Sequence, residues 1–102
     1  MGIGMRSVYW VEVLRLIPTA DHLDRAKLDA VLGWFDPEDL SPLQPLIATS
    51  DPELNLYLLD GHCRAWALWA TGVEMAPIVV RDGVCPSRLS ELPRDISSLP
   101  IL

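Results

Sequence analysis

Hydrophobic and polar residues along this chain follow first a strand pattern and then a helix pattern. Residues 8–16 are rich in β-branched and aromatic side chains, which favours a first strand. From Leu23 the apolar residues recur at close to helical spacing, which predicts a helix over 23–35 with Asp21 placed to cap it. Three prolines and three acidic residues within 36–45 then predict a connecting loop.

The second half of the chain changes from strand to helix again. Two short apolar runs, 46–49 and 54–59, are separated by turn-forming residues and predict a β-hairpin. Residues 62–71 have the pattern of a buried helix that Gly72 ends, and a further strand is predicted at 78–80.

These elements predict one domain over residues 1–102, of the α+β (α/β-like) class: a small mixed β-sheet with two main helices. Prolines give it an irregular tail from about residue 81 to 102. A chain of this length can bury one hydrophobic core, with Trp10 and Trp34 expected at the surface. The residues expected in that core are Leu56, Leu58, Ala65, Leu68, Trp69, Ile78 and Val80.

Composition and charge narrow the class of partner. Half of the residues are hydrophobic (50%), which excludes a disordered chain. Fourteen acidic residues against eight basic ones give a net charge of -6, which opposes binding to phosphate backbones, so no autonomous specific DNA binding is expected. The sequence shows neither a signal peptide nor a membrane-spanning run, so no membrane partner is expected. The two cysteines, Cys63 and Cys85, fit a reducing cytoplasm.

One dense polar cluster, Asp60-Gly61-His62-Cys63-Arg64, lies where the predicted hairpin meets the second helix. The first turn of a helix has free N–H groups that bind anions, Gly61 lets a ligand approach the backbone, and Arg64 can donate to two oxygens at once. Asp60 could bind a metal or accept a substrate proton, and His62 could donate to a phosphate oxygen. The cluster therefore predicts a phosphate site.

Each of these residues also has a purely structural interpretation. Asp60 could cap the helix, His62 could be a surface side chain, and Cys63 could be a small buried hydrophobe. Arg64 could pair with an acid such as Asp60 or Glu74. Cysteines and histidines lack the short paired spacing of a zinc site, so no structural metal is expected.

The same cluster resembles an Asp-Gly-His-x-Arg-Ala signature found in part of the ParB and sulfiredoxin-like superfamily. Further likeness is spread over most of the chain, at residues 16–19, 45–47, 57–62, 72 and 76–80. The resemblance implies a ParB/sulfiredoxin-like fold with a nucleotide or phosphate bound at this turn. The implied catalytic residues are Asp60 and His62, and the implied phosphate-binding residues are Gly61, His62, Cys63 and Arg64.

The chain departs from the individual members of that superfamily. Partition proteins have Gly-Glu-Arg-Arg here, so His62 replaces their Glu and Cys63 replaces their first Arg. Sulfiredoxins have Gly-Gly-Cys-His-Arg, which places their reactive Cys at His62. A free-serine kinase is more similar through its Asp-Gly-His pattern, in which Asp60 is the natural acid and Asp21 loosely matches a second acidic residue.

Two functions remain open on the sequence. The first is a nucleotide- or phosphate-binding domain, with phosphoryl transfer or NTP hydrolysis as the expected activity and Mg²⁺ as the cofactor that accompanies the nucleotide. The second is a non-catalytic interaction or regulatory domain with a protein partner. Asp60 together with Arg64 favours the first, and the His62-Cys63 pair favours the second. In both cases we expect the helix to begin at His62 or Cys63, with its first N–H groups facing an open pocket.

Overall fold

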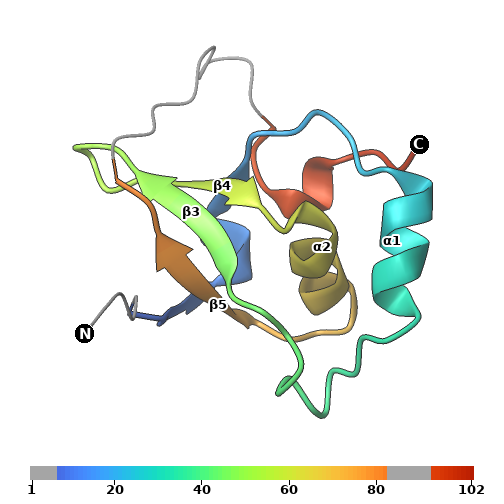
Figure 1. The fold of residues 1–102 in the computed structure, drawn as a ribbon. Coiled ribbons are helices and arrows are strands. Elements are labelled where there is room, and N and C mark those ends of the chain that lie inside the picture. The colour runs from blue at the N-terminus through green and yellow to red at the C-terminus, as the bar shows by residue number, and fades with distance from the viewer. Residues whose placement is uncertain (1–6, 83–92) are drawn as a thin grey trace.

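A computed structural model describes residues 7–82 and 93–102 of the chain. Five strands form one mixed sheet in the order β1-β5-β3-β4-β2. Helix α2 packs against the sheet, and helix α1 packs against α2 on its far side (Figure 1). The strands are β1 (Tyr9–Glu12), β2 (Leu16–Pro18), β3 (Leu46–Ser50), β4 (Leu56–Asp60) and β5 (Met75–Val80). The helices are α1 (Arg25–Leu32) and α2 (His62–Ala70), with short 3-10 helices at η1 (Val13–Arg15) and η3 (Ile96–Ser98).

This arrangement confirms the predicted α+β class, with a small mixed sheet and two main helices. Strands β3 and β4 form the predicted antiparallel hairpin. Its turn is fixed by Asp51, whose carboxylate accepts hydrogen bonds from the N–H of Asn55 (2.9 Å) and the hydroxyl of Tyr57 (2.9 Å). Within the described ranges, no helix has the length and apolar character needed to cross a membrane.

The prediction of one continuous first strand over 8–16 is wrong, because residues 9–18 form two strands, β1 and β2, on opposite edges of the sheet. β1 pairs antiparallel with β5, whereas β2 pairs parallel with β4. The η1 turn between them redirects the chain and buries Val13, whose N–H donates to the carbonyl oxygen of Glu74 (2.8 Å). Since the residues of this turn are as apolar as those of a strand, their composition did not indicate it.

Helix α1 is shorter than predicted, and Asp21 does not cap it. The N-cap is Asp24, whose carboxylate accepts a hydrogen bond from the N–H three residues later (3.1 Å). Asp21 instead pairs with the neighbouring His22, Oδ1 to Nδ1, at 2.7 Å. The helix ends at Leu32, with Gly33 as its C-cap, so the predicted residues 33–35 are not helical.

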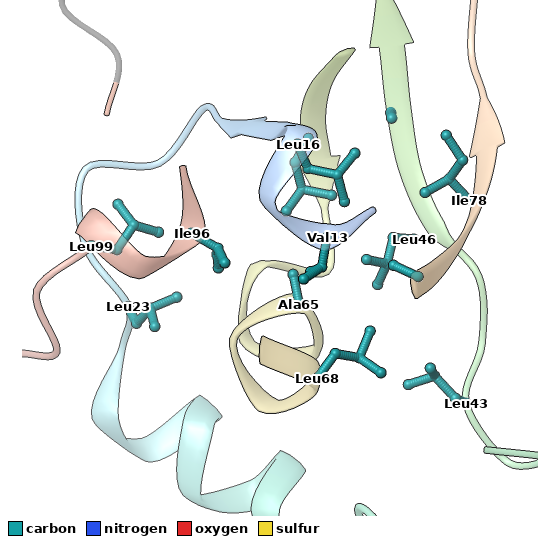
Figure 2. Close-up of a cluster of buried hydrophobic side chains, with 13 residues drawn as sticks. Val13, Leu16, Leu23, Leu43, Leu46, Ala65, Leu68, Ile78, Ile96 and Leu99 are labelled. Carbon is teal, nitrogen blue, oxygen red and sulfur yellow. The ribbon is translucent and has the colours of Figure 1, made fainter. Parts of the chain in front are cut away.

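The hydrophobic core lies between the sheet and α2 (Figure 2). Ala65 and Leu68 of α2, Leu46 of β3 and Ile78 of β5 are all at most 1% exposed. The prediction is also confirmed for Leu58, and Leu56 and Val80 pack against the cluster as partly buried residues.

Trp69 does not belong to the core, contrary to the prediction, and is 37% exposed. It follows Leu68 by one residue, a step of about 100° around a helix, so it points away from the buried side. Its ring packs edge-on against Trp66, with the centroids 6.0 Å apart, and Trp66 in turn contacts the core. Trp10 and Trp34 are exposed, as predicted.

Part of the proline-containing tail packs onto the domain. Ile96 and Leu99 are buried in the same core cluster. Leu23 forms a parallel bridge with Ile101, and its N–H donates to the carbonyl oxygen of Pro100 (2.8 Å), so the end of the chain lies beside the start of α1 (Figure 1). The remainder of the predicted tail, from 83 to 92 with the second cysteine, lies outside the described residues.

Candidate functional site

The predicted polar cluster occupies the junction between β4 and α2. Asp60 ends the strand, Gly61 is the N-cap of the helix, and His62 is the first helical residue, as predicted. Gly61 has φ +98°, in the left-handed region that glycine adopts without steric cost. The interpretation of Asp60 as the cap is therefore wrong. Since glycine has no side chain, the cap residue leaves the first N–H groups of α2 without a side-chain acceptor.

Two side chains also lie close to the position that a Cβ of residue 61 would occupy. A Cβ added at this position would lie 2.6 Å from Cδ2 of Leu46 and 2.9 Å from Nη2 of Arg64. Leu46 is fully buried, so it has little freedom to move away. Both the backbone conformation and the packing therefore require glycine here.

Arg64 folds back over Gly61 and ties α2 to the loop that enters β3. Its Nη1 donates to the carbonyl oxygens of Gln44 (2.9 Å) and Pro45 (3.4 Å). Its Nη2 lies 3.7 Å from Oδ2 of Asp60. The Arg64 side chain is 18% exposed and that of Asp60 is 69% exposed, so the ion pair is largely solvated and weak. Of Asp60 and Glu74, the two acids considered as partners of Arg64, Asp60 is the one that forms the ion pair.

His62 holds the start of α2 against the segment that follows β2. Its Nε2 accepts a hydrogen bond from the N–H of Thr19 (3.1 Å), and the Thr19 hydroxyl donates to the carbonyl oxygen of Leu58 (2.7 Å). An Nε2 that accepts is unprotonated, so the ring is neutral and carries its proton on Nδ1. Burial lowers the pKa of His62, and the carboxylate of Asp60 acts in the opposite direction. His62 is therefore partly buried and bonded, not a simple surface side chain.

The hydrogen bond from the Thr19 N–H to Nε2 of His62 predicts a pH-dependent step in the free energy of unfolding. Because burial and the Thr19 N–H disfavour the charged ring, the folded protein takes up a proton at His62 less readily than the unfolded chain, where the ordinary pKa is 6.5. The part of the stability that depends on a neutral His62 should be fully present above pH 6.5. It should decrease as the pH falls toward the lower folded-state pKa, and then become constant. One proton gives a slope of at most about 1.4 kcal/mol per pH unit, which urea unfolding at a series of pH values would measure.

The informative variant is His62→Gln, because glutamine keeps a hydrogen-bond acceptor and does not titrate. We expect the step to disappear in His62→Gln. It should remain in His22→Gln, since His22 pairs with the exposed Asp21 and makes no contact that this step needs. An unchanged step in His62→Gln would contradict this account of the Thr19 bond.

Cys63 packs against the core as a partly buried side chain. Burial and the nearby carboxylate of Asp24 raise the pKa of its thiol, and Lys27 opposes them. A thiol with a raised pKa stays protonated at neutral pH and is a poor nucleophile. The geometry thus agrees with the interpretation of Cys63 as a small hydrophobe, and any phosphate contact would use its backbone N–H.

A cleft of about 400 Å³ opens beside the N-terminus of α2 and faces α1. It brings together all five residues of the predicted cluster. Sequence reasoning missed the residues of the opposite wall, among them Lys27 and His22, which α1 and the loop before it supply. Lys27 is the single lysine of the chain, and a lone lysine on the polar side of a predicted helix was the one available signal. The remaining lining residues are Ala20, Leu23, Asp24 and Val31.

A larger groove, of about 800 Å³, lies along the sheet at β1 and β5 and was not predicted. Its apolar lining includes Tyr9, Val11, Leu56, Ile78 and Val80. The residues of the predicted phosphate site do not line this groove. The groove with the larger volume is therefore not the one that contains the candidate phosphate-binding residues. We place the candidate site at the smaller cleft, where donors and titratable groups converge.

Fold and site together define a small α+β domain with a cleft at a strand-glycine-helix junction. No known family model matches the chain, and no curated protein matches it. Among solved structures the chain is similar to the crystal structure of protein Atu1540 from Agrobacterium tumefaciens, with a TM-score of 0.69 and 17% sequence identity. The match covers 95% of this chain and 63% of that chain, so the protein spans less than two thirds of Atu1540. At this identity the likeness shows a shared fold.

Proposed function

We propose that the cleft at the start of α2 binds a nucleotide or a phosphorylated small molecule, as the resemblance to the ParB and sulfiredoxin-like superfamily implies. The observation that carries the proposal is the glycine N-cap of α2, which leaves the positive end of the helix dipole without a side-chain cap beside a cleft of about 400 Å³. Lys27 and Arg64 add positive charge to the walls of the same cleft.

Each residue has a distinct part in anion binding. The first N–H groups of α2 would donate to phosphate oxygens, and Lys27 would contribute a point charge. Arg64 would exchange neutral carbonyl acceptors, at Gln44 and Pro45, for charged oxygens that form stronger hydrogen bonds. Nδ1 of His62 keeps its proton as a donor, because Nε2 is engaged by Thr19.

Phosphoryl transfer or NTP hydrolysis is the activity that we propose for this site. Asp60 is 69% exposed at the cleft and could accept the proton of a substrate hydroxyl or a water molecule. In the part of the chain that the structure describes, no three His, Cys, Asp or Glu side chains are grouped to hold a metal ion. Mg²⁺ fits this donor set only together with a nucleotide, because the phosphate oxygens would supply metal ligands in addition to the Asp60 carboxylate.

A non-catalytic interaction or regulatory domain is the second candidate, and three contacts favour it. Nε2 of His62 and the guanidinium of Arg64 are both engaged in bonds that hold the fold together. Cys63, with its raised thiol pKa, packs on the core. In this alternative the cluster stabilises the junction, and a protein partner would bind elsewhere on the surface.

Thermal unfolding in the presence of nucleotides separates the two candidates. The panel should contain nucleoside mono-, di- and triphosphates and inorganic phosphate, each with and without Mg²⁺. A ligand present at 100 times its Kd adds about 2.7 kcal/mol of stability, which is a readily measured shift in Tm. A shift with at least one phosphate ligand supports the first candidate, and no shift with any of them supports the second.

The Arg64→Lys variant tests whether Arg64 is the phosphate clamp, that is, the side chain that donates to two phosphate oxygens at once. Lysine keeps the charge but loses the two-pronged donor, so affinity for the ligand found in the panel should fall by about tenfold or more, the value of one charged hydrogen bond. Isothermal titration and urea unfolding are measured on the same protein. We expect the loss of binding to exceed what the change in stability explains.

Arg15→Lys is the matched control, because Arg15 is exposed in η1 and does not line the cleft. It should bind like the wild type. If Arg64→Lys also binds like the wild type and only unfolds more easily, Arg64 is a structural residue that holds the loop at Gln44, and it is not the phosphate clamp.

A further inference from the structure

β1 lies at one edge of the sheet, and β5 is its one strand neighbour among the described residues. An edge strand presents a row of backbone N–H and C=O groups that can pair with another strand. Proteins usually protect such an edge with Lys, Pro, a charge or a bulge. Residues Val8 to Val11 contain none of these, and the charged residues nearest to them in the sequence are Arg6 and Glu12.

Both faces of β1 expose large apolar side chains. Tyr9 lies opposite Ile78 and therefore shares the face of the sheet that carries the core, whereas Trp10 lies opposite Pro77 on the other face. Tyr9 is 54% exposed and Trp10 is 55% exposed, and Val8 before them is 46% exposed. A strand that is apolar on both faces is typical of the interior of a sheet and not of its edge.

The groove of about 800 Å³ continues the core face of the sheet toward this edge. Val11, Leu56 and Val80 line it and also pack against the core cluster. Three residues of β1 line the groove, Tyr9, Trp10 and Val11, and the first two are more than half exposed. A strand added beside β1 would extend the same apolar face and cover more of it.

We propose that β1 pairs antiparallel with β1 of a second copy of this chain, about a two-fold axis at Trp10. Directly opposed residues of an antiparallel pair share a face, so two identical strands keep their faces aligned only when the axis passes through a residue. With the axis at Trp10, that side chain meets Trp10 of the partner subunit, and Tyr9 meets Val11 of the partner subunit. Aromatic pairs and pairs of an aromatic with a β-branched residue are favourable across strands.

The charges along β1 fit pairing with a second copy in the antiparallel direction. Each chain carries a net charge of -6, so an interface between two copies must keep like charges apart. The antiparallel pairing places Glu12 opposite Val8 of the partner subunit. An in-register parallel pairing would place Glu12 beside Glu12 of the partner subunit, which is unfavourable. The uncharged stretch from Val8 to Val11 is therefore complementary to itself in one direction only.

Sedimentation velocity on the full chain, from low micromolar to near-millimolar concentration, tests the pairing. The wild type should form a concentration-dependent dimer, and Trp10→Lys should weaken it by at least about tenfold because it places charges on the edge and opposes them across the axis. Trp34→Lys is the matched control, since Trp34 is also exposed, at 45%, but follows α1. It should dimerise like the wild type. A wild type that stays monomeric, or a dimer that Trp10→Lys leaves unchanged, would overturn the proposal.

Oxidative crosslinking tests the register. Opposed Cα atoms in an antiparallel pair lie about 4.5–5.5 Å apart, within the range of a disulfide, so Trp10→Cys should form a dimer linked between its two residues 10. In Glu12→Cys the two equivalent positions would be offset by four residues, about 13 Å, and should not link. Mass spectrometry of the linked peptides distinguishes these bonds from any formed by Cys63 or Cys85. Linkage through Glu12→Cys and not through Trp10→Cys would overturn the register.

Discussion

Leu68→Ala should lower the free energy of unfolding by about 2–5 kcal/mol, the range found when a buried leucine is truncated in a close-packed core. Leu68 is fully buried on α2, in the same cluster as Leu43 and Leu46 (Figure 2). The substitution removes apolar contacts and leaves a cavity between helix and sheet that the neighbouring strands cannot fully close. Urea unfolding followed by circular dichroism measures the change.

Leu54→Ala is the matched control for this prediction. It is the same chemical change at a side chain that is 73% exposed, in the turn between β3 and β4. Its effect should stay within about 0.5 kcal/mol, as for most surface substitutions. A loss of under about 0.5 kcal/mol in Leu68→Ala as well would mean that α2 does not contribute this side chain to the core.

Periodicity in the sequence predicted the elements whose burial follows one simple pattern. The hairpin and α2 are of this kind, because their apolar residues match the periods of a strand and a helix. The start of α1 was missed for a tertiary reason. Leu23 is held extended by its bridge to Ile101 and by the hydrogen bond from its N–H to Pro100, so the helix begins two residues later, after Asp24. Two aspartates were available as caps, and only contacts with the far end of the chain decide between them.

For the candidate site as well, the sequence predicted the local cluster but not its tertiary contacts. The sequence alone singled out the five residues from Asp60 to Arg64, since they are contiguous and interrupt an apolar stretch. It could not supply their partners, because these come from distant segments. Thr19 lies 43 residues before His62, and Gln44 lies 20 residues before Arg64. Whether a polar residue serves the fold or a ligand depends on such contacts, which no local pattern encodes.

Gly61→Ala should lower the free energy of unfolding by about 2–5 kcal/mol, from two sources. A left-handed backbone conformation costs an L residue about 1–2 kcal/mol, and Gly61 has φ +98°. Overpacking a filled site costs about 1–3 kcal/mol more, since the new Cβ would lie 2.6 Å from Cδ2 of the buried Leu46. Urea unfolding at neutral pH measures the total.

Gly72→Ala separates the two sources, because Gly72 has φ +83° but nothing lies within 4 Å of an added Cβ. It should lose only the backbone part, about 1–2 kcal/mol. Both variants restrict the unfolded chain in the same way, so that effect cancels in the comparison. The difference between them reports the contact at Gly61 alone. Equal losses would mean that Leu46 and Arg64 move aside freely, and the close packing over the start of α2 would then not be what requires glycine at the junction.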